Sequence, residues 1–104
     1  MRLHKRQFEI AEGITLTGHY WDTETGSGTY FQGRFNLPLW ENSSLIHAIE
    51  QQLNQVLPPG DDGQPPISST ITNESLSPVL IFNSDLEAAV LATARRLAQA
   101  QPTP

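Results

Sequence analysis

The chain has 104 residues, with eleven acidic and six basic side chains and a net charge of −5. This length corresponds to one domain with a single core, and the absence of cysteine excludes disulfides and thiolate metal sites. An acidic balance disfavours nucleic acid as a partner, because nucleic-acid affinity comes largely from cations that neutralise phosphates. Charged residues make up only 16% of the chain, and the neutral polar residues that replace them are compatible with a surface that contacts other proteins.

The N-terminal stretch MRLHKRQFEI carries basic residues, but no apolar run follows it. A cleavable signal peptide needs such a run, and a membrane-spanning helix needs about 18 consecutive apolar residues. We therefore expect a cytoplasmic protein without a membrane span. Residues 1–7 are expected to form a flexible basic N-terminus, residues 8–100 a single domain and residues 101–104 a disordered tail.

Two stretches of alternating polarity predict a β-hairpin. The first, FEIAEGITLTGHYW, alternates from Ile14 onward, and Gly13 marks a bulge or a break between two shorter pieces. Seven polar residues, DTETGSG, lead to the second stretch, TYFQGRFNL. When Tyr20 is placed opposite Phe31, one face of the hairpin is apolar throughout, whereas a slip of one residue would mix the two faces.

The apolar face of this hairpin places Gly18 opposite Gly33. A glycine inside a strand weakens it and often marks the close approach of another element. A helix packed tightly over the hairpin would explain the pair, and so would a shallow cavity for a small ligand. A ligand in such a cavity would contact Gly18, Tyr20, Phe31 and Gly33.

The opposite face of the hairpin gathers residues suited to binding a protein: His19, Trp21, Tyr30, Gln32 and Arg34. Trp, Tyr and Arg dominate the binding energy of protein interfaces. Two other interpretations use the same residues, an ordinary cross-strand aromatic pair and a stacking platform for single-stranded nucleic acid. The acidic balance and the lack of an RNA-recognition motif argue against nucleic acid.

The stretch ENSSLIHAIEQQLNQVL, residues 41–57, predicts a helix. Apolar residues recur in it at intervals of three and four, and Glu50, Gln51, Asn54 and Gln55 line the opposite side. Asn42 or Ser43 is expected to cap its N-terminus, and the prolines that follow Leu57 to end it.

Two further strands and a second helix are predicted after residue 66. The strands are ISSTIT and LSPVLIFN, and the apolar run VLIF favours a central position for the second of them. Pro78 is expected at the start of that strand, where its missing N–H is tolerated. The sequence from Ser84 to Glu87 predicts a capping box, in which Ser84 caps the helix and Glu87 reaches back.

The predicted order is therefore ββαββα. Each helix has a single apolar stripe, which favours an α+β fold with a four-stranded, mainly antiparallel sheet and both helices packed on one face. This arrangement leaves the other sheet face, which carries Trp21 and Tyr30, uncovered by helices.

No pattern in the chain predicts catalysis, a cofactor or a metal site. The glycines at 26–28 precede a strand, whereas a phosphate-binding loop precedes a helix. Asp61 and Asp62 lack the further oxygen ligands of a calcium loop, and His19 has no second histidine at a metal-binding spacing. We therefore expect a protein that is not an enzyme.

These observations favour a small acidic protein-interaction module, acting as a regulator, an inhibitor or an accessory subunit. It would bind a protein partner through the aromatic sheet face. Two alternatives remain: a small-ligand-binding domain that uses the space over Gly18 and Gly33, and a homodimer whose sheet face is the self-association surface.

Overall fold

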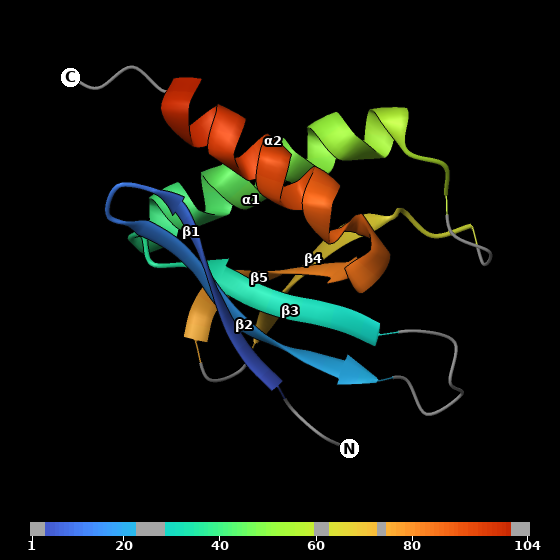
Figure 1. The fold of residues 1–104 in the computed structure, drawn as a ribbon, viewed down its shortest axis with the longest axis horizontal. Helices are drawn as coiled ribbons and strands as arrows, with labels where there is room; N and C mark the ends of the chain where they lie inside the picture. Colours follow the sequence, from blue (N-terminus) through green and yellow to red (C-terminus); the bar gives the residue numbers. More distant parts are fainter. Residues whose placement is uncertain (1–3, 23–28, 60–62, 73–74, 101–104) are drawn as a thin grey trace.

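The computed structural model describes residues 4–22, 29–59, 63–72 and 75–100. These residues form a five-stranded antiparallel sheet with two α-helices on one of its faces (Figure 1). In chain order the elements are β1 (His4–Ala11), β2 (Ile14–Asp22), β3 (Thr29–Phe35), α1 (Leu39–Val56), β4 (Ile67–Thr72), β5 (Ser75–Asn83), a 3-10 turn (Ser84–Leu86) and α2 (Glu87–Ala100).

The α+β class, the antiparallel sheet and the two helices are confirmed, but the expected number of strands is wrong. The described residues form five strands, and the order of elements is βββαββα. The reason lies at Gly13, which has a φ of 80°, a left-handed conformation that glycine adopts easily. Ala11 and Ile14 are paired, so the chain turns back on itself between them and the stretch predicted as one interrupted strand becomes two paired strands.

The pairing of β1 with β2 also changes the description of the N-terminus. β1 begins at His4, and His4 lies opposite Tyr20. Residues 4–7, expected to belong to a flexible segment, are therefore part of the sheet. Residues 1–3, the glycines at 26–28, Asp61 with Asp62, and residues 101–104 lie outside the described residues.

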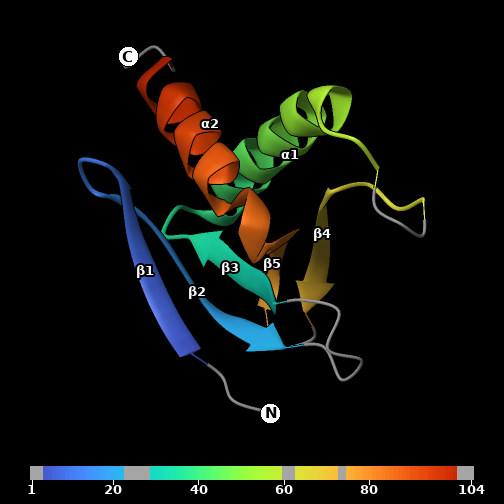
Figure 2. The ribbon, with the colours of Figure 1, turned by 45° about the vertical axis from the view of Figure 1, so that its right-hand side comes forward.

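The strands follow the order β1-β2-β3-β5-β4, so β1 and β4 form the two edges (Figure 2). The predicted hairpin register between β2 and β3 is confirmed, since Tyr20 lies opposite Phe31 and Trp21 opposite Tyr30. β5 lies between β3 and β4, which confirms the interior position predicted from its apolar run. Pro78 is the fourth residue of β5 and not its first.

The core lies between the sheet and the helices. α1 packs on β4 and β5, and α2 packs on β1. The predicted apolar stripe of the first helix is confirmed for four of its six members, which are buried: Leu45, Ile46, Ile49 and Leu53. It is wrong for Val56, which is 74% exposed, and Leu57 follows the helix and is partly exposed. The sheet contributes a row of aromatic rings, in which Phe31 contacts Phe8, Tyr20 and Phe82 with ring centroids 5.2–5.7 Å apart.

The predicted helix caps are wrong for both helices. Pro38 precedes α1, and no side chain caps this end. The 3-10 turn before α2 is capped by Asn83, whose side chain accepts a hydrogen bond from the N–H of Asp85 at 2.9 Å. The carboxylate of Glu87 accepts a hydrogen bond from the hydroxyl of Tyr20. Glu87 thus joins α2 to the sheet through Tyr20, a residue distant in the sequence.

Asn42, expected as a cap, is buried and links α1 to two strands. Its Oδ1 accepts from the N–H of Phe35 at 2.9 Å, and its Nδ2 donates to Ser77 Oγ at 2.7 Å and to the carbonyl of Pro78 at 3.0 Å. A buried polar side chain is stable when its donors and acceptors are satisfied. Asn42 therefore fixes the start of α1 against the ends of β3 and β5.

Candidate protein-binding surface

The five residues predicted to bind a partner lie on one face of the sheet. In β2 and β3, alternate side chains point to opposite faces, and the register places Trp21 opposite Tyr30, His19 opposite Gln32 and Thr17 opposite Arg34. Phe31 and Phe35 have the other parity and are buried under the helices. The predicted residues therefore share the sheet face that the helices leave uncovered (Figure 2), which we call the open face.

Trp21 and Tyr30 are stacked on each other at one end of the open face. Their ring centroids are 5.2 Å apart, and the ring planes differ by 22°. A stacked aromatic pair contributes about 0.5–1.5 kcal/mol beyond the area it buries. Both rings are partly exposed, while Trp21 Nε1 is buried without an acceptor among the described residues. The pair is thus both a cross-strand contact and a preorganised aromatic surface.

β5 extends the open face with two aliphatic side chains that sequence reasoning did not assign to it. Ile81 lies opposite Gln32 and has the same parity as Val79. Val79 is 9% exposed, yet it does not belong to the core cluster under the helices. The run VLIF favours burial on both sides of the strand, and this is confirmed in part. Leu80 and Phe82 are buried on the helix side, and on the other side Val79 is buried while Ile81 is partly exposed.

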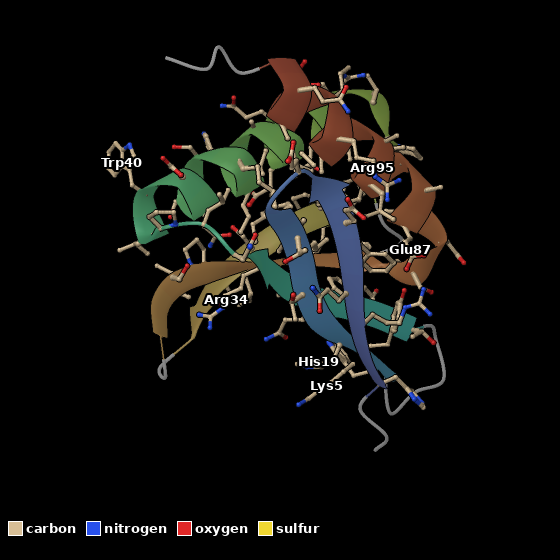
Figure 3. All side chains as sticks on the ribbon, turned by 60° about the vertical axis from the view of Figure 1, so that its left-hand side comes forward. Lys5, His19, Arg34, Trp40, Glu87 and Arg95 are labelled. Carbon is tan, nitrogen blue, oxygen red and sulfur yellow. The ribbon has the colours of Figure 1, made fainter. Side chains whose placement is uncertain are left out.

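The charge on the open face differs from that of the whole molecule. Lys5 lies opposite His19, and both lie with Arg34 on the strand side of the molecule, away from α1 and α2 (Figure 3). Among the described strand residues of this parity, Lys5 and Arg34 are cationic and Glu9 is the one acidic residue. A chain with a net charge of −5 therefore presents a sheet face with an excess of positive charge.

The four residues predicted to contact a small ligand lie together on the helix side of β2 and β3. A Cβ added to Gly33 would lie 2.7 Å from Phe31 Cε1 and 2.7 Å from the carbonyl oxygen of Thr17. A Cβ added to Gly18 would lie 2.1 Å from the carbonyl oxygen of Gln32. A helix or a cavity was expected over the two glycines. The atoms that come closest to them are instead those of the neighbouring backbone and of the Phe31 ring. Tyr20 adds a hydrogen bond to Glu87 of α2.

The described residues contain no group of three or more His, Asp or Glu side chains that could hold a metal ion. His19 lies on β2 and His47 on α1. Within the same part of the chain, neither helix is long and apolar enough to cross a membrane.

Comparison of this chain with protein-family models, with curated proteins and with solved structures found no match. The geometry and chemistry of the open face are therefore what indicate a function.

Proposed function

We propose that the protein is a small interaction module that binds a protein partner through the open face, as a regulator, an inhibitor or an accessory subunit. The observation that supports this most directly is the placement of both helices on one side of the sheet (Figure 1). The other side carries a tryptophan, a tyrosine and an arginine, the three residue types that dominate binding hot spots. The lack of cysteine agrees with a reducing compartment, and we propose the cytoplasm.

The layout of the open face resembles that of an interface. Trp21, Tyr30 and Ile81 supply apolar and aromatic area, while Lys5 on the edge strand and Arg34 on the central strand supply charge. Interfaces combine apolar and aromatic area with polar groups in this way. The excess of positive charge favours a partner that offers acidic side chains around an apolar one, because complementary charge speeds encounter and suppresses wrong partners.

A binding role through the open face is favoured over the ligand-binding alternative because Phe31 fills the space beside Gly33. Single-stranded nucleic acid is a weaker candidate. Two cations neutralise few phosphates, whereas a strong nucleic-acid contact uses about 6–10 of them.

The test is affinity capture with the immobilised protein and two charge-reversed variants. Lys5→Glu combined with Arg34→Glu changes the open face, and Arg96→Glu makes the same kind of change on α2. Both cations of the double variant are exposed, so the fold should be retained, which circular dichroism checks. We expect a partner captured by the wild type to be lost by the double variant and retained by Arg96→Glu. Equal capture by all three proteins would contradict the proposal.

The mass in solution, measured by light scattering across a wide concentration range, separates partner binding from self-association. We expect a monomer. A dimer that the Trp21→Ala variant dissociates would assign the open face to self-association and would refute the proposal of a foreign partner.

A further inference from the structure

A second surface lies at the edge of the sheet formed by β4. In the sheet order, β4 is hydrogen-bonded to β5 alone, and in the ranges that the structure describes no segment pairs with its outer side. Edge strands are usually protected by charged residues, proline or a bulge. β4 has the sequence ISSTIT, without charge or proline, and its one irregularity lies at the far end, between Ile71 and Thr72.

The hydrogen bonds of Asn54 reveal which backbone groups of β4 point outward. Asn54 Oδ1 accepts from the N–H of Ile67, and its Nδ2 donates to the carbonyl of Ile67, both at 2.9 Å. The polar groups of Ile67 therefore point away from β5. In an antiparallel strand this direction repeats at every second residue, so the N–H and C=O groups of Ser69 and Ile71 point outward as well.

Pro78 supports this assignment independently. It lies opposite Ile71 in β5 and has no N–H to donate. The Ile71–Pro78 pair therefore needs no hydrogen bond between β4 and β5, as expected if Ile71 directs its groups outward. The side-chain amide of Asn54 bonds the outward backbone groups of Ile67, as a neighbouring strand would. The outward N–H and C=O groups of Ser69 and Ile71 are the next two sites at which an added strand could bond.

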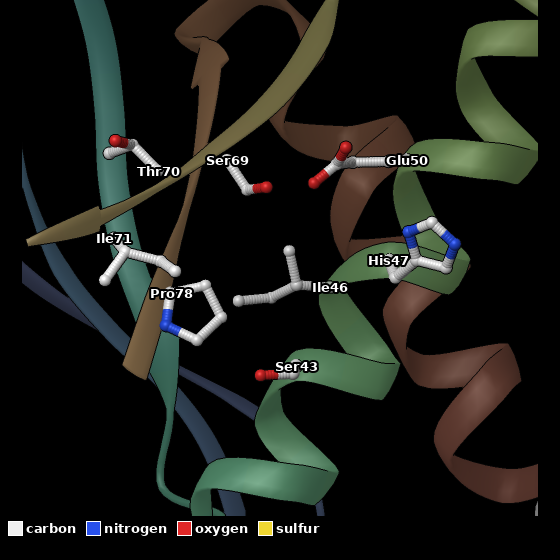
Figure 4. Close-up of a pocket in the computed structure, with 8 residues that line it drawn as sticks. All are labelled: Ser43, Ile46, His47, Glu50, Ser69, Thr70, Ile71 and Pro78. Carbon is white, nitrogen blue, oxygen red and sulfur yellow. The ribbon is translucent and has the colours of Figure 1, made fainter. Parts of the chain in front are cut away.

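A groove lies beside this edge, between β4 and α1 (Figure 4). It has a volume of about 710 Å³. Ile46, Pro78 and Ile71 give it an apolar part, and Ile71 is 63% exposed. Glu50 projects into it from α1, and no lysine or arginine is among the residues that line it. A strand added along β4 would direct alternate side chains toward this groove.

We propose that β4 and this groove bind an extended peptide segment of another protein, which adds to the sheet as a further strand. Backbone hydrogen bonds to Ser69 and Ile71 would supply affinity, as in other cases of strand addition. One aliphatic side chain of the peptide lies over Ile71 and Pro78, and a basic side chain two residues away contacts Glu50.

The charge of the groove favours a foreign basic peptide over a second copy of this chain as the segment that binds the β4 edge. Two copies joined through their β4 edges would place both Glu50 carboxylates on the same side of the joined sheet, in a protein with a net charge of −5. A basic side chain from a foreign peptide would instead complement Glu50. This surface is separate from the open face, because the side chains of Ser69 and Ile71 lie on the helix side of the sheet.

The probe is a displayed library of randomised seven-residue peptides with glycine–serine flanks, selected on the immobilised full-length protein. We expect enrichment of sequences with an aliphatic residue two positions from lysine or arginine and no proline between them. A synthetic copy of an enriched peptide should then slow amide exchange at Ser69 and Ile71 in NMR spectra. Failure to enrich such peptides, or peptide-induced shifts confined to Trp21 and Tyr30, would overturn the proposal.

Three variants test the contacts with the synthetic peptide. Ile71→Lys and Glu50→Lys should each weaken binding at least tenfold. Val56→Lys serves as the matched control, because Val56 is 74% exposed on α1 and does not line the groove, and it should leave the affinity unchanged. Equal affinities for all three variants would refute the proposal.

Ser69→Pro removes an outward N–H without removing a hydrogen bond between β4 and β5, and it should also abolish peptide binding. If the wild type were instead a dimer that Ser69→Pro dissociates, a second copy would occupy the edge and the proposal of a foreign peptide would be overturned. Because none of these variants touches the open face, failure here leaves the proposed function intact.

Discussion

The strongest prediction about stability concerns the buried amide of Asn42. Asn42→Ala removes three hydrogen bonds and leaves the N–H of Phe35 buried without a partner. An unsatisfied buried donor costs about 1–3 kcal/mol, and a lost hydrogen bond to a partly accessible group about 0.5–1.5 kcal/mol. The bonds to Ser77 and Pro78 are partly buried, so water can replace some of their energy. We expect the free energy of unfolding to fall by about 3 kcal/mol.

Asn36→Ala is the matched control, because Asn36 makes the same kinds of bonds in an exposed position. Its Oδ1 accepts from the N–H of Thr15 at 2.7 Å, and its Nδ2 donates to the carbonyl of Gly13 at 3.0 Å. Water can satisfy these groups once the side chain is gone, so we expect a loss of only about 1 kcal/mol.

Urea unfolding followed by circular dichroism measures both losses. With a slope of about 1.5 kcal/mol per molar urea, the Asn42 variant should unfold at a midpoint about 2 M lower than the wild type, and the Asn36 variant at about 0.7 M lower. If the two losses of unfolding free energy agreed within about 0.5 kcal/mol, the reasoning would be refuted. Burial would then not determine how much a side-chain amide contributes to stability.

Four further substitutions test the sheet, its first turn and its contact with α2. Gly18→Ala should lower the free energy of unfolding by about 3 kcal/mol, because the added Cβ meets the carbonyl oxygen of Gln32; a loss below about 1 kcal/mol in urea unfolding would contradict this. Gly13→Ala should lose only about 1 kcal/mol, since open space surrounds the site and the positive φ is the sole penalty; the same assay should rank it below Gly18→Ala. Tyr20→Phe should lower the thermal midpoint by about 4–8 °C, as expected for loss of about 1 kcal/mol. Combining it with Glu87→Ala, which removes the acceptor, should add less than Glu87→Ala costs alone, because the two side chains share one hydrogen bond; additive losses would count against that bond.

In addition to Asn83, three asparagines of the described residues bond the backbone where strands end or lack a neighbour. Asn36 bonds the turn between β1 and β2, Asn42 the ends of β3 and β5, and Asn54 the start of β4. Each side-chain amide offers one acceptor and two donors, so it can stand in for a backbone peptide group. The pairing of Asn54 with Ile67 also identifies which backbone groups of β4 point away from β5.

The sequence by itself determined those features that depend on local periodicity. The alternation in residues 14–21 and 29–35 was sufficient for the register of β2 and β3, because a slip by one residue would have moved Leu16 and Phe35 out of the core. The apolar stripe of α1 follows from intervals of three and four residues in the same way. The register of β2 and β3 is also what places His19, Trp21, Tyr30, Gln32 and Arg34 on one sheet face.

Only the tertiary structure decided the features that depend on partners distant in the chain. Gly13 was expected to mark a bulge or a break within one stretch of strand, and the pairing of β1 with β2 makes it part of a turn. Glu87 and Asn54 were assigned to a cap and to a polar helix face, but Tyr20 and the backbone of Ile67 are their partners. Such hydrogen bonds join segments 13–67 residues apart and leave no periodic trace in the sequence. The order of strands, the free edge of β4 and the groove beside it arise for the same reason, when the second hairpin packs β5 against β3.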